Sequence, residues 1–440
     1  MRSFSIGGIH PPELKFSCGC SITLADLPKQ AFVMLNQHIG KQAVPVVAKG
    51  DTVKVGQLIA KADGFVSANI HAPVSGKVNK IDEIADVSGY RHPAIIIDTE
   101  GDDWMDDIDR STDLVRDCNL KPEEIISRIA AAGIVGMGGA CFPTHVKLTI
   151  PKGKKAEVVI VNAVECEPYL TADHRLMLEK GEEILVGLTL LMKAVNVDRG
   201  IIGIESNKKD AIEHLKLLSV SYPGITTMPL KVKYPQGGEK QLIEAVTGRH
   251  VPSGALPVDV GAVVQNVATV FAVYEAVQKN KPLFERVMTV TGKDLKEPGN
   301  FLVRIGTQMS ELTDSCCLPE DAAKFISGGP MMGKPLINLS VPMTKGCSGL
   351  LVISEKEAMR KEVKNCIRCA KCVVACPMGL EPFLFMTLTE HEDWAKLEKE
   401  RIMDCIECGC CTYSCPSNRP LLDYLRIGKS KVGEIIRGRK

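Results

Sequence analysis

The fold of the last part of this chain is decided by two stretches, NCIRCAKCVVACP at 365–377 and DCIECGCCTYSCP at 404–416. Both have the spacing Cys-x2-Cys-x2-Cys-x3-Cys-Pro, and each cysteine of the first recurs 39 residues later in the second. Thiolates at this spacing converge on a four-iron cubane, and the cysteine beside the proline binds the other cluster. A zinc site needs only two CxxC pairs, and a disulfide knot needs export. The repeat therefore predicts two [4Fe–4S] clusters in a helical, ferredoxin-like domain.

The same rule divides eight cysteines into two ligand sets, each taking its fourth member from the other half of the repeat. Cys410 falls outside the repeat and is expected to be a spare thiol. The first set is Cys366, Cys369, Cys372 and Cys415, and the second is Cys405, Cys408, Cys411 and Cys376.

The composition of the whole chain is that of an ordinary globular protein. Its 440 residues predict about three domains, and its 45% hydrophobic and 24% charged residues argue against disorder. A net charge of +1 gives no reason to expect nucleic-acid binding. No apolar leader follows Met1, and no stretch has the roughly 20 apolar residues of a membrane helix. We therefore expect an intracellular protein, soluble or peripheral to a membrane.

A glycine-rich stretch lies in the middle of the chain, after a helix that is expected to begin at Pro122 and to stop at Gly133. It reads GMGGACFPT at 136–144 and is followed by Lys147. Glycines let backbone N–H groups approach a phosphate closely, although many such runs are only turns. The run is not the dinucleotide fingerprint, because Cys141 stands where G-x-G-x-x-G needs its third glycine.

The next segment predicts a buried parallel strand over 157–162, which leads into Asn162, Glu165 and Glu167. Ligands of α/β sheets bind outside the carboxyl ends of the strands, although a solvated acidic loop is the alternative here. Helix and strand patterns then alternate over 175–195, 200–205, 208–219, 226–233 and 239–247, which indicates α/β architecture.

These motifs together resemble the flavin- and NADH-binding subunit of complex-I-type dehydrogenases. The likeness continues through YPQGGE at 234–239 and VVQNV at 263–267, and it departs from the family pattern at Met137, Val164, Gly238 and Gln265. The resemblance implies FMN as the flavin, held along the glycine loop. It carries FMN contacts onto Gly136, Gly138, Lys147, Asn162, Glu165, Gly237, Gln265 and Asn266, with Gly139 in the same loop, and NADH contacts onto Phe142, Glu167 and Glu239.

Over its full length the chain resembles the C subunits of the Rnf electron-transport complexes, with GGIHP at 7–11, the middle motifs and the cysteine repeat in that family's order. The implied fold is multidomain, α/β plus β. It comprises a leader at 1–30, a barrel-sandwich domain at 31–100, a Rossmann-like FMN/NADH domain at 118–280, a β-grasp (SLBB) domain at 281–352, a bis-[4Fe–4S] ferredoxin domain at 358–428 and a basic tail at 429–440.

Three smaller features carry expectations of their own. The barrel-sandwich domain is similar to lipoyl domains, but no lysine occupies its hairpin tip near Gly64-Phe65, so we expect a docking or structural role without lipoylation. Seven acids at 98–109 predict an exposed linker. The basic residues after 425 predict a solvated tail or attraction to an anionic membrane or acidic partner.

The resemblance implies an NADH dehydrogenase subunit of an ion-translocating ferredoxin:NAD oxidoreductase complex. It would lie peripherally at the cytoplasmic face of the cell membrane, where other subunits of the complex, NADH and, indirectly, ferredoxin are its partners. The departures at Met137, Val164 and Gly238 keep an alternative open: a ferredoxin-like electron-transfer adaptor without nucleotide binding. A non-redox quinone- or ligand-binding scaffold is a further alternative, suggested by the barrel-sandwich and β-grasp domains.

Overall fold

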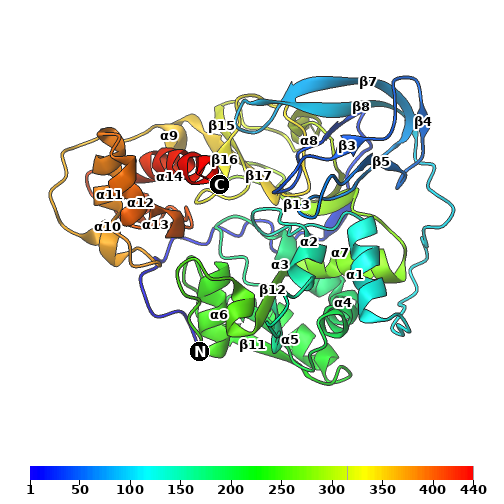
Figure 1. Ribbon diagram of the computed structural model, residues 1–440. Helices are drawn as coiled ribbons and strands as arrows, with labels where there is room; N and C mark the ends of the chain where they lie inside the picture. The colour runs from blue at the N-terminus through cyan, green and yellow to red at the C-terminus, as the bar shows by residue number, and fades with distance from the viewer. Residues whose placement is uncertain (315, 440) are drawn as a thin grey trace.

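The computed structural model describes residues 1–314 and 316–439 and shows four units (Figure 1). We call them the barrel-sandwich unit (30–101), the α/β unit (122–278), the mixed-sheet unit (285–354) and the cysteine-rich unit (366–438). The first three pack together, and the cysteine-rich unit lies to one side of them (Figure 1). Within the described part of the chain, none of the helices has the length and apolar character needed to cross a bilayer.

The α/β unit contains a parallel sheet in the strand order β11-β10-β9-β12. The alternation of helices and strands expected from the sequence is confirmed, and the helix that follows Pro122 gives way at Gly133, whose φ is +65°. The strands are β9 (Val158–Asn162), β10 (Gly200–Glu205), β11 (Ile225–Leu230) and β12 (Ala262–Asn266). The helices are α1 (Pro122–Ala131), α2 (Thr144–Leu148), α3 (Ala172–Glu179), α4 (Gly181–Ala194), α5 (Lys209–Ser219), α6 (Glu239–Thr247), α7 (Val267–Gln278) and the 3-10 turn η1 (Pro257–Val260).

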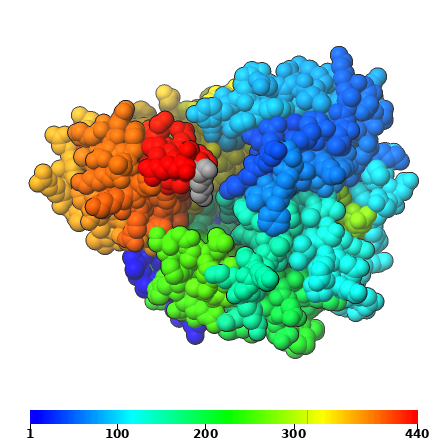
Figure 2. Space-filling model, viewed as in Figure 1, coloured from blue at the N-terminus to red at the C-terminus, as the bar shows by residue number. Residues whose placement is uncertain are grey.

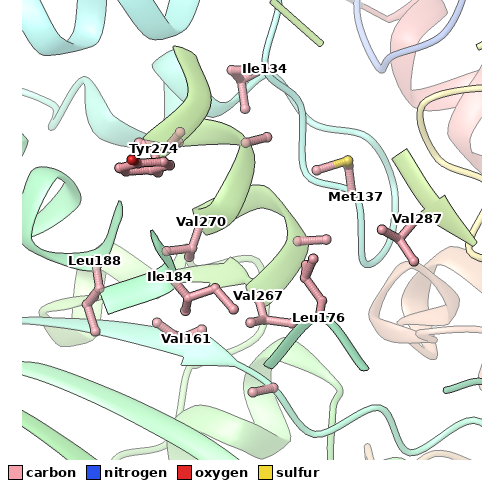
Figure 3. Packing of buried hydrophobic residues seen from close by; sticks show 14 of the residues in the cluster. Ile134, Met137, Val161, Leu176, Ile184, Leu188, Val267, Val270, Tyr274 and Val287 are labelled. Carbon is pink, nitrogen blue, oxygen red and sulfur yellow. The ribbon is translucent and has the colours of Figure 1, made fainter. Parts of the chain in front are cut away.

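Helices cover both faces of this sheet. The strand β9 is accordingly apolar on both sides, as strands of parallel sheets usually are. Val161 of β9 packs with Ile184 of α4 and Val270 of α7 on one face (Figure 3). Ile160, which alternates to the other face, packs with Leu242 of α6. The burial on two sides fixes β9 at the centre of the unit, and its carboxyl end therefore has a fixed place.

The barrel-sandwich unit consists of two small sheets, β2-β8-β7-β4 and β3-β5-β6. The loop between β5 and β6 carries Phe65, whose carbonyl lies 3.3 Å from His145 Nε2 of α2, while Lys61 only ends β5. The hairpin tip thus contacts the α/β unit, and the docking or structural role expected of this unit stays a prediction. The strands are β2 (Gln30–Met34), β3 (Val44–Pro45), β4 (Thr52–Val53), β5 (Leu58–Lys61), β6 (Ile70–His71), β7 (Ser75–Ala85) and β8 (Arg91–Gly101).

The mixed-sheet unit has six strands in the order β1-β14-β13-β17-β15-β16. Its edge strand β1 comes from the N-terminal segment and pairs in parallel with β14 from Ile22 to Leu24. The expectation of a separate leader at 1–30 was therefore wrong for these residues. The strands are β1 (Ile22–Leu24), β13 (Glu285–Thr291), β14 (Gly299–Arg304), β15 (Ala322–Ser327), β16 (Lys334–Pro335) and β17 (Gly349–Ser354), and α8 (Met309–Asp314) and α9 (Glu355–Ala358) accompany them.

The backbone of the cysteine-rich unit repeats with the 39-residue offset of the sequence. Short helices α10 and α13 occupy equivalent places, and each follows a left-handed residue, Ala370 or Gly409. Arg368 and Glu407 are a second left-handed pair at the same offset, with φ of 54° and 55°. The helices are α10 (Lys371–Val374), α11 (Pro382–Glu390), α12 (Trp394–Lys399), η2 (Ile402–Asp404), α13 (Cys410–Tyr413) and α14 (Leu421–Gly438).

The acidic segment at 98–109 and the basic segment after 425 were expected to be exposed, but ion pairs or helix packing fix each of them in the fold. The acidic run begins inside β8, and Asp102 and Asp109 then pair with Arg304 and Lys279, so the run is not a free linker. The basic residues from Arg426 to Arg437 belong to α14, which packs on α11 and α12 through buried Val432. The predicted tail at 429–440 is therefore wrong over its described residues: the helix crosses that boundary without a break.

Lys345 joins three of the units. It is buried, and its Nζ donates to the carbonyl of Asn69 at 2.7 Å and to that of Gly133 at 2.8 Å. Removal from water lowers the pKa of this amine to about 7, with the nearby Cys141 opposing the shift. A neutral amine has two hydrogens, which is the number that the two carbonyls require.

This burial predicts a pH dependence of stability. The unfolded chain holds the Lys345 proton up to about pH 10.4 and the folded chain only up to about pH 7, so the free energy of unfolding should rise between these values. Calorimetry of the cofactor-free chain at pH 7 and 9 measures this rise. Lys345→Met should reduce it, whereas the exposed-site control Lys49→Met should not. Equal slopes in all three proteins would contradict the prediction.

Candidate functional site

The site forms where the carboxyl ends of β9 and β12 lie side by side. Asn162 ends β9, Asn266 ends β12, and the two residues are partners in the parallel register. The Asn162 Nδ2 donates to the carbonyl of Gly237 at 2.8 Å, which brings the turn before α6 to the same edge. Three of the residues predicted from sequence are thus brought together, at the edge of the sheet where α/β proteins bind ligands.

The glycine loop packs against the beginning of α7. The Met137 N–H donates to Thr269 Oγ1 at 2.9 Å, and the Gly136 N–H closes the loop onto the Phe142 carbonyl at 2.9 Å. A Cβ on Gly138 would lie only 2.6 Å from Asn266 Nδ2, whereas one on Gly139 would meet no described atom within 4 Å. Gly138 therefore needs to be glycine because of its neighbour, and Gly139 faces open space.

Lys147 and Glu239 form an ion pair at this edge. Lys147 extends from α2, Glu239 begins α6, and the Nζ to Oε1 distance is 2.7 Å with both side chains partly exposed. The Nζ also lies 3.3 Å from the Val264 carbonyl of β12. A residue expected to hold a phosphate and one expected to hold NADH are therefore mutual partners in this structure.

The buried amide of Gln265 is the sharpest sign that the site takes a polar ligand. Only 2% of this residue is exposed, and neither its Oε1 nor its Nε2 has a hydrogen-bond partner among the described residues. Leaving such groups unpaired costs about 1–3 kcal/mol, so they are normally satisfied. Together with the lysine, the amides and the open glycine loop, this donor set fits a flavin phosphate and a heteroaromatic ring.

The two acids after β9 have separate positions. The Glu165 carboxylate accepts the N–H groups of Asp173 and His174 at 2.7 and 3.2 Å, which places it at the start of α3. Glu167 instead faces the mixed-sheet unit, where it accepts the N–H of Met332 at 2.7 Å. Burial raises the pKa of Glu167 to about 7. Their assignment to FMN and NADH stays a prediction.

Two functional neighbours were missed by the sequence analysis. Asp173 is partly buried in α3 and accepts from Asn266 Nδ2 at 2.7 Å, which orients that amide. Burial, and then the charge of Glu165, raise the pKa of Asp173 to about 7. Lys15, far away in sequence, donates to carbonyls of the loop that carries both acids. Neither residue stands in a motif, so no local spacing could have found them.

Four of the predicted cluster ligands line a single pocket in the cysteine-rich unit. They are Cys376, Cys405, Cys408 and Cys411, which is the second predicted set, including its member from the other half of the repeat. Cys410, Leu380, Leu422 and Leu425 are among the other residues that line it. Burial raises the pKa of Cys405 to about 11 and that of Cys411 to about 12, so these thiols need a cation to become thiolates. An iron–sulfur cluster would supply that charge, so the chemistry of these four thiols suits one.

The first predicted set is more open. Burial raises the pKa of Cys372, and the nearby charge of Cys415 adds to the rise, whereas Cys366 and Cys369 lie in an exposed segment. In 1–314 and 316–439, no group of three or more His, Cys, Asp or Glu side chains stands ready to hold a metal ion. The two ligand sets therefore remain predictions. Cys410 is buried beside Tyr234, outside both sets.

Comparison with family models divides the chain in the order of its units. Residues 3–102 match the RnfC barrel sandwich hybrid domain, and residues 129–275 match the Nuo51 FMN-binding domain. Residues 287–335 match the SLBB domain, and residues 362–419 match the 4Fe–4S dicluster domain. FMN and [4Fe–4S] clusters are thus the cofactors of the matched domains.

The relatives match over nearly the whole chain. The C subunit of the proton-translocating ferredoxin:NAD(+) oxidoreductase complex of Clostridium ljungdahlii is 46% identical, covering 98% of this chain and 94% of the relative. The C subunit of the Na(+)-translocating complex of Acetobacterium woodii is 43% identical, covering 97% and 96%. The C subunit of the ion-translocating oxidoreductase complex of Rhodobacter capsulatus is 43% identical, covering 99% and 84%.

A solved structure shares the fold. A chain of the air-oxidized NAD+-reducing [NiFe]-hydrogenase superposes with a TM-score of 0.51 at 19% identity, covering 71% of this chain and 63% of that one. The sequence expectations of barrel-sandwich, flavin-type α/β, β-grasp and ferredoxin-like parts are confirmed. From the relatives and the domain order, this chain belongs to the RnfC family, the C subunits of the Rnf ion-translocating oxidoreductase complexes.

Proposed function

We propose that this chain is the NADH:FMN oxidoreductase subunit of an ion-translocating ferredoxin:NAD oxidoreductase complex. It passes electrons between NAD(H), FMN and two [4Fe–4S] clusters. One observation carries the proposal: the edge of the sheet that fits a flavin and the pocket of four cysteines are joined by Tyr234. Its backbone precedes the Gly237 turn, and its hydroxyl donates to the Cys408 carbonyl at 2.9 Å.

The residues at the edge of the sheet would bind and orient the flavin. Lys147 is suited to neutralise a phosphate as a point charge, and its release from Glu239 would leave that carboxylate free to accept from ribose hydroxyls. Asn162, Asn266 and Gln265 offer amides to the ring. Bound FMN would supply hydride acceptance from NADH and release of single electrons, while the protein supplies orientation.

The two predicted cysteine sets differ in how deeply their thiols are buried. Cys376, Cys405, Cys408 and Cys411 would hold a cluster next to the α/β unit, and Cys366, Cys369, Cys372 and Cys415 would hold one at the surface. We also propose that the chain binds peripherally at the cytoplasmic face of the membrane through other subunits of its complex. The names of its relatives support this, since they are subunits of translocating complexes.

An anaerobic titration with NADH tests the proposal. The reconstituted chain should lose its flavin absorbance on addition of NADH, and the cluster absorbance should then fall. Bound flavin that NADH does not reduce would refute the dehydrogenase function. Clusters without any bound flavin would favour the alternative, an electron-transfer adaptor without nucleotide binding.

Gly138 and Gly19 give a matched pair of variants for testing the flavin site. Gly138→Ala places a methyl group against the Asn266 amide, and overpacking of this kind costs about 1–3 kcal/mol, or about 5- to 150-fold in affinity. Gly19→Ala lies outside the predicted FMN contacts, meets no described atom within 4 Å and should bind FMN as the wild type does. Fluorescence titration of the cofactor-free chain with FMN measures both. Equal affinities would remove Gly138 from the site.

Cys408 and Cys410 form a matched pair for the clusters. Both are buried, but only Cys408 belongs to a predicted ligand set. Cys408→Ser should reduce iron from about eight to about four atoms per chain, and Cys410→Ser should leave it near eight. Iron analysis after anaerobic reconstitution gives the count. NADH should still reduce the flavin of Cys408→Ser, because hydride transfer precedes the clusters.

A further inference from the structure

The N-terminal segment runs between the cysteine-rich unit and the α/β unit (Figure 1), and its first residues are visible as a dark blue patch there (Figure 2). The family model that begins at residue 3 describes a barrel sandwich, yet the strands of that unit begin only at Gln30. Residues 7–15, which we call the strap, instead contact the cysteine-rich unit and the α/β unit. The proposed function assigns these residues no role.

Gly7 and Gly8 fit the strap against a cysteine loop. Gly7 has a φ of +65°, and a Cβ on it would overlap the carbonyl of Cys376. The Gly8 N–H donates to the Ala375 carbonyl at 3.0 Å. A side chain at position 7 would therefore push the strap away from the loop that carries Cys376, and the left-handed backbone adds a further penalty.

The next residue ties the strap to the α/β unit. Ile9 and Tyr234 exchange two backbone hydrogen bonds, at 2.8 and 2.9 Å, like one rung of an antiparallel ladder. The hydroxyl of the same tyrosine donates to the Cys408 carbonyl at 2.9 Å. Ile9, Tyr234, Ala375 and Cys408 also share one buried apolar cluster. The strap and Tyr234 thus hold both halves of the cysteine repeat against the edge of the sheet.

Lys15 fixes the acidic loop beside them. Its buried ammonium donates to the carbonyls of Glu165, Glu167 and Leu170 at 2.9, 2.8 and 2.6 Å, which uses all three of its hydrogens. Glu165 and Tyr169 in this loop are left-handed, so the loop makes no regular ladder of its own. The Tyr169 N–H in turn donates to the Glu13 carbonyl of the strap at 2.9 Å.

From these contacts we propose that the strap is a positioning element for electron transfer, holding the pocket of Cys376, Cys405, Cys408 and Cys411 at a fixed separation from the flavin edge. The inference rests on the proposed function and adds a role to it. Two electrons that NADH leaves on the flavin depart one at a time, each reducing a cluster by one, and no bond to the strap forms or breaks. Gly7, Ile9, Lys15 and Tyr234 are positioning residues.

The experiment compares Gly7→Ala with Gly19→Ala in the full chain carrying FMN and clusters. A Cβ on Gly19 would meet no described atom within 4 Å, so this variant controls for alanine in the same segment. In stopped-flow mixing with NADH, Gly7→Ala should keep the wild-type rate of flavin reduction and slow the reduction of the clusters. Equal cluster rates in both variants would overturn the proposal, as would a common loss of both phases in Gly7→Ala.

Hydrogen exchange gives a readout that needs no NADH chemistry. The left-handed penalty at position 7 should weaken the docked strap about 5- to 30-fold, which appears as lost protection of residues 233–236 and 375–379. Unchanged protection would overturn the inference even if NADH reduces the flavin. A wild type with full protection whose flavin NADH cannot reduce would instead refute the proposed function alone.

Tyr234→Phe covers the case in which Gly7→Ala does not fold. It removes the hydroxyl that donates to Cys408 and lies 3.5 Å from Glu167 Oε1, and it keeps the two backbone hydrogen bonds with Ile9. Slower cluster reduction with unchanged flavin reduction is expected here too, together with faster exchange at 408–411. Wild-type behaviour in both measurements would refute the positioning role of Tyr234.

Discussion

The parallel pairing of β9 with β12 is the constraint on which the rest of the structure depends. Because both strands are buried on two faces, their register is fixed by packing, and Asn162 and Asn266 must end at the same level. The glycine loop, the start of α7 and the Gly237 turn are then placed by contacts with these two amides. A slip of one residue would turn each amide to the opposite face of the sheet.

The other units are arranged around that edge. The barrel-sandwich unit supports the glycine loop from behind, through its contact with His145 and through the Asn69 carbonyl that accepts from Lys345. The mixed-sheet unit donates a backbone N–H group to the carboxylate of Glu167, and a carbonyl of the cysteine-rich unit accepts the hydroxyl of Tyr234. Three units therefore shape the edge of the sheet, and the fourth carries the cysteine repeat.

Most of this organisation could be predicted from sequence where the signal is local or periodic. The 39-residue repeat predicted equivalent cysteine loops, and the backbone repeats down to its left-handed residues. The strand at 157–162 predicted the edge where Asn162 lies. Lys15 and Asp173 could not be predicted, because their partners are backbone carbonyls and an amide that only the tertiary fold brings near. The charges of α14 were misjudged for the same reason: their partners, such as Glu407 and Glu398, lie in other turns of the unit.

The position of Gly7 has a consequence for the order in which the molecule is built. Its contact, the loop at Ala375–Pro377, is synthesised long after residue 7 has left the ribosome, and long after the α/β unit is complete. Domains generally fold in the order of their synthesis. The N-terminal segment can therefore pair with the α/β unit early, as Ile9 does with Tyr234, whereas Gly7 meets its partner only when the cysteine-rich unit has been made. The loop that carries Cys376 therefore docks late, onto an N-terminal segment that the α/β unit already holds.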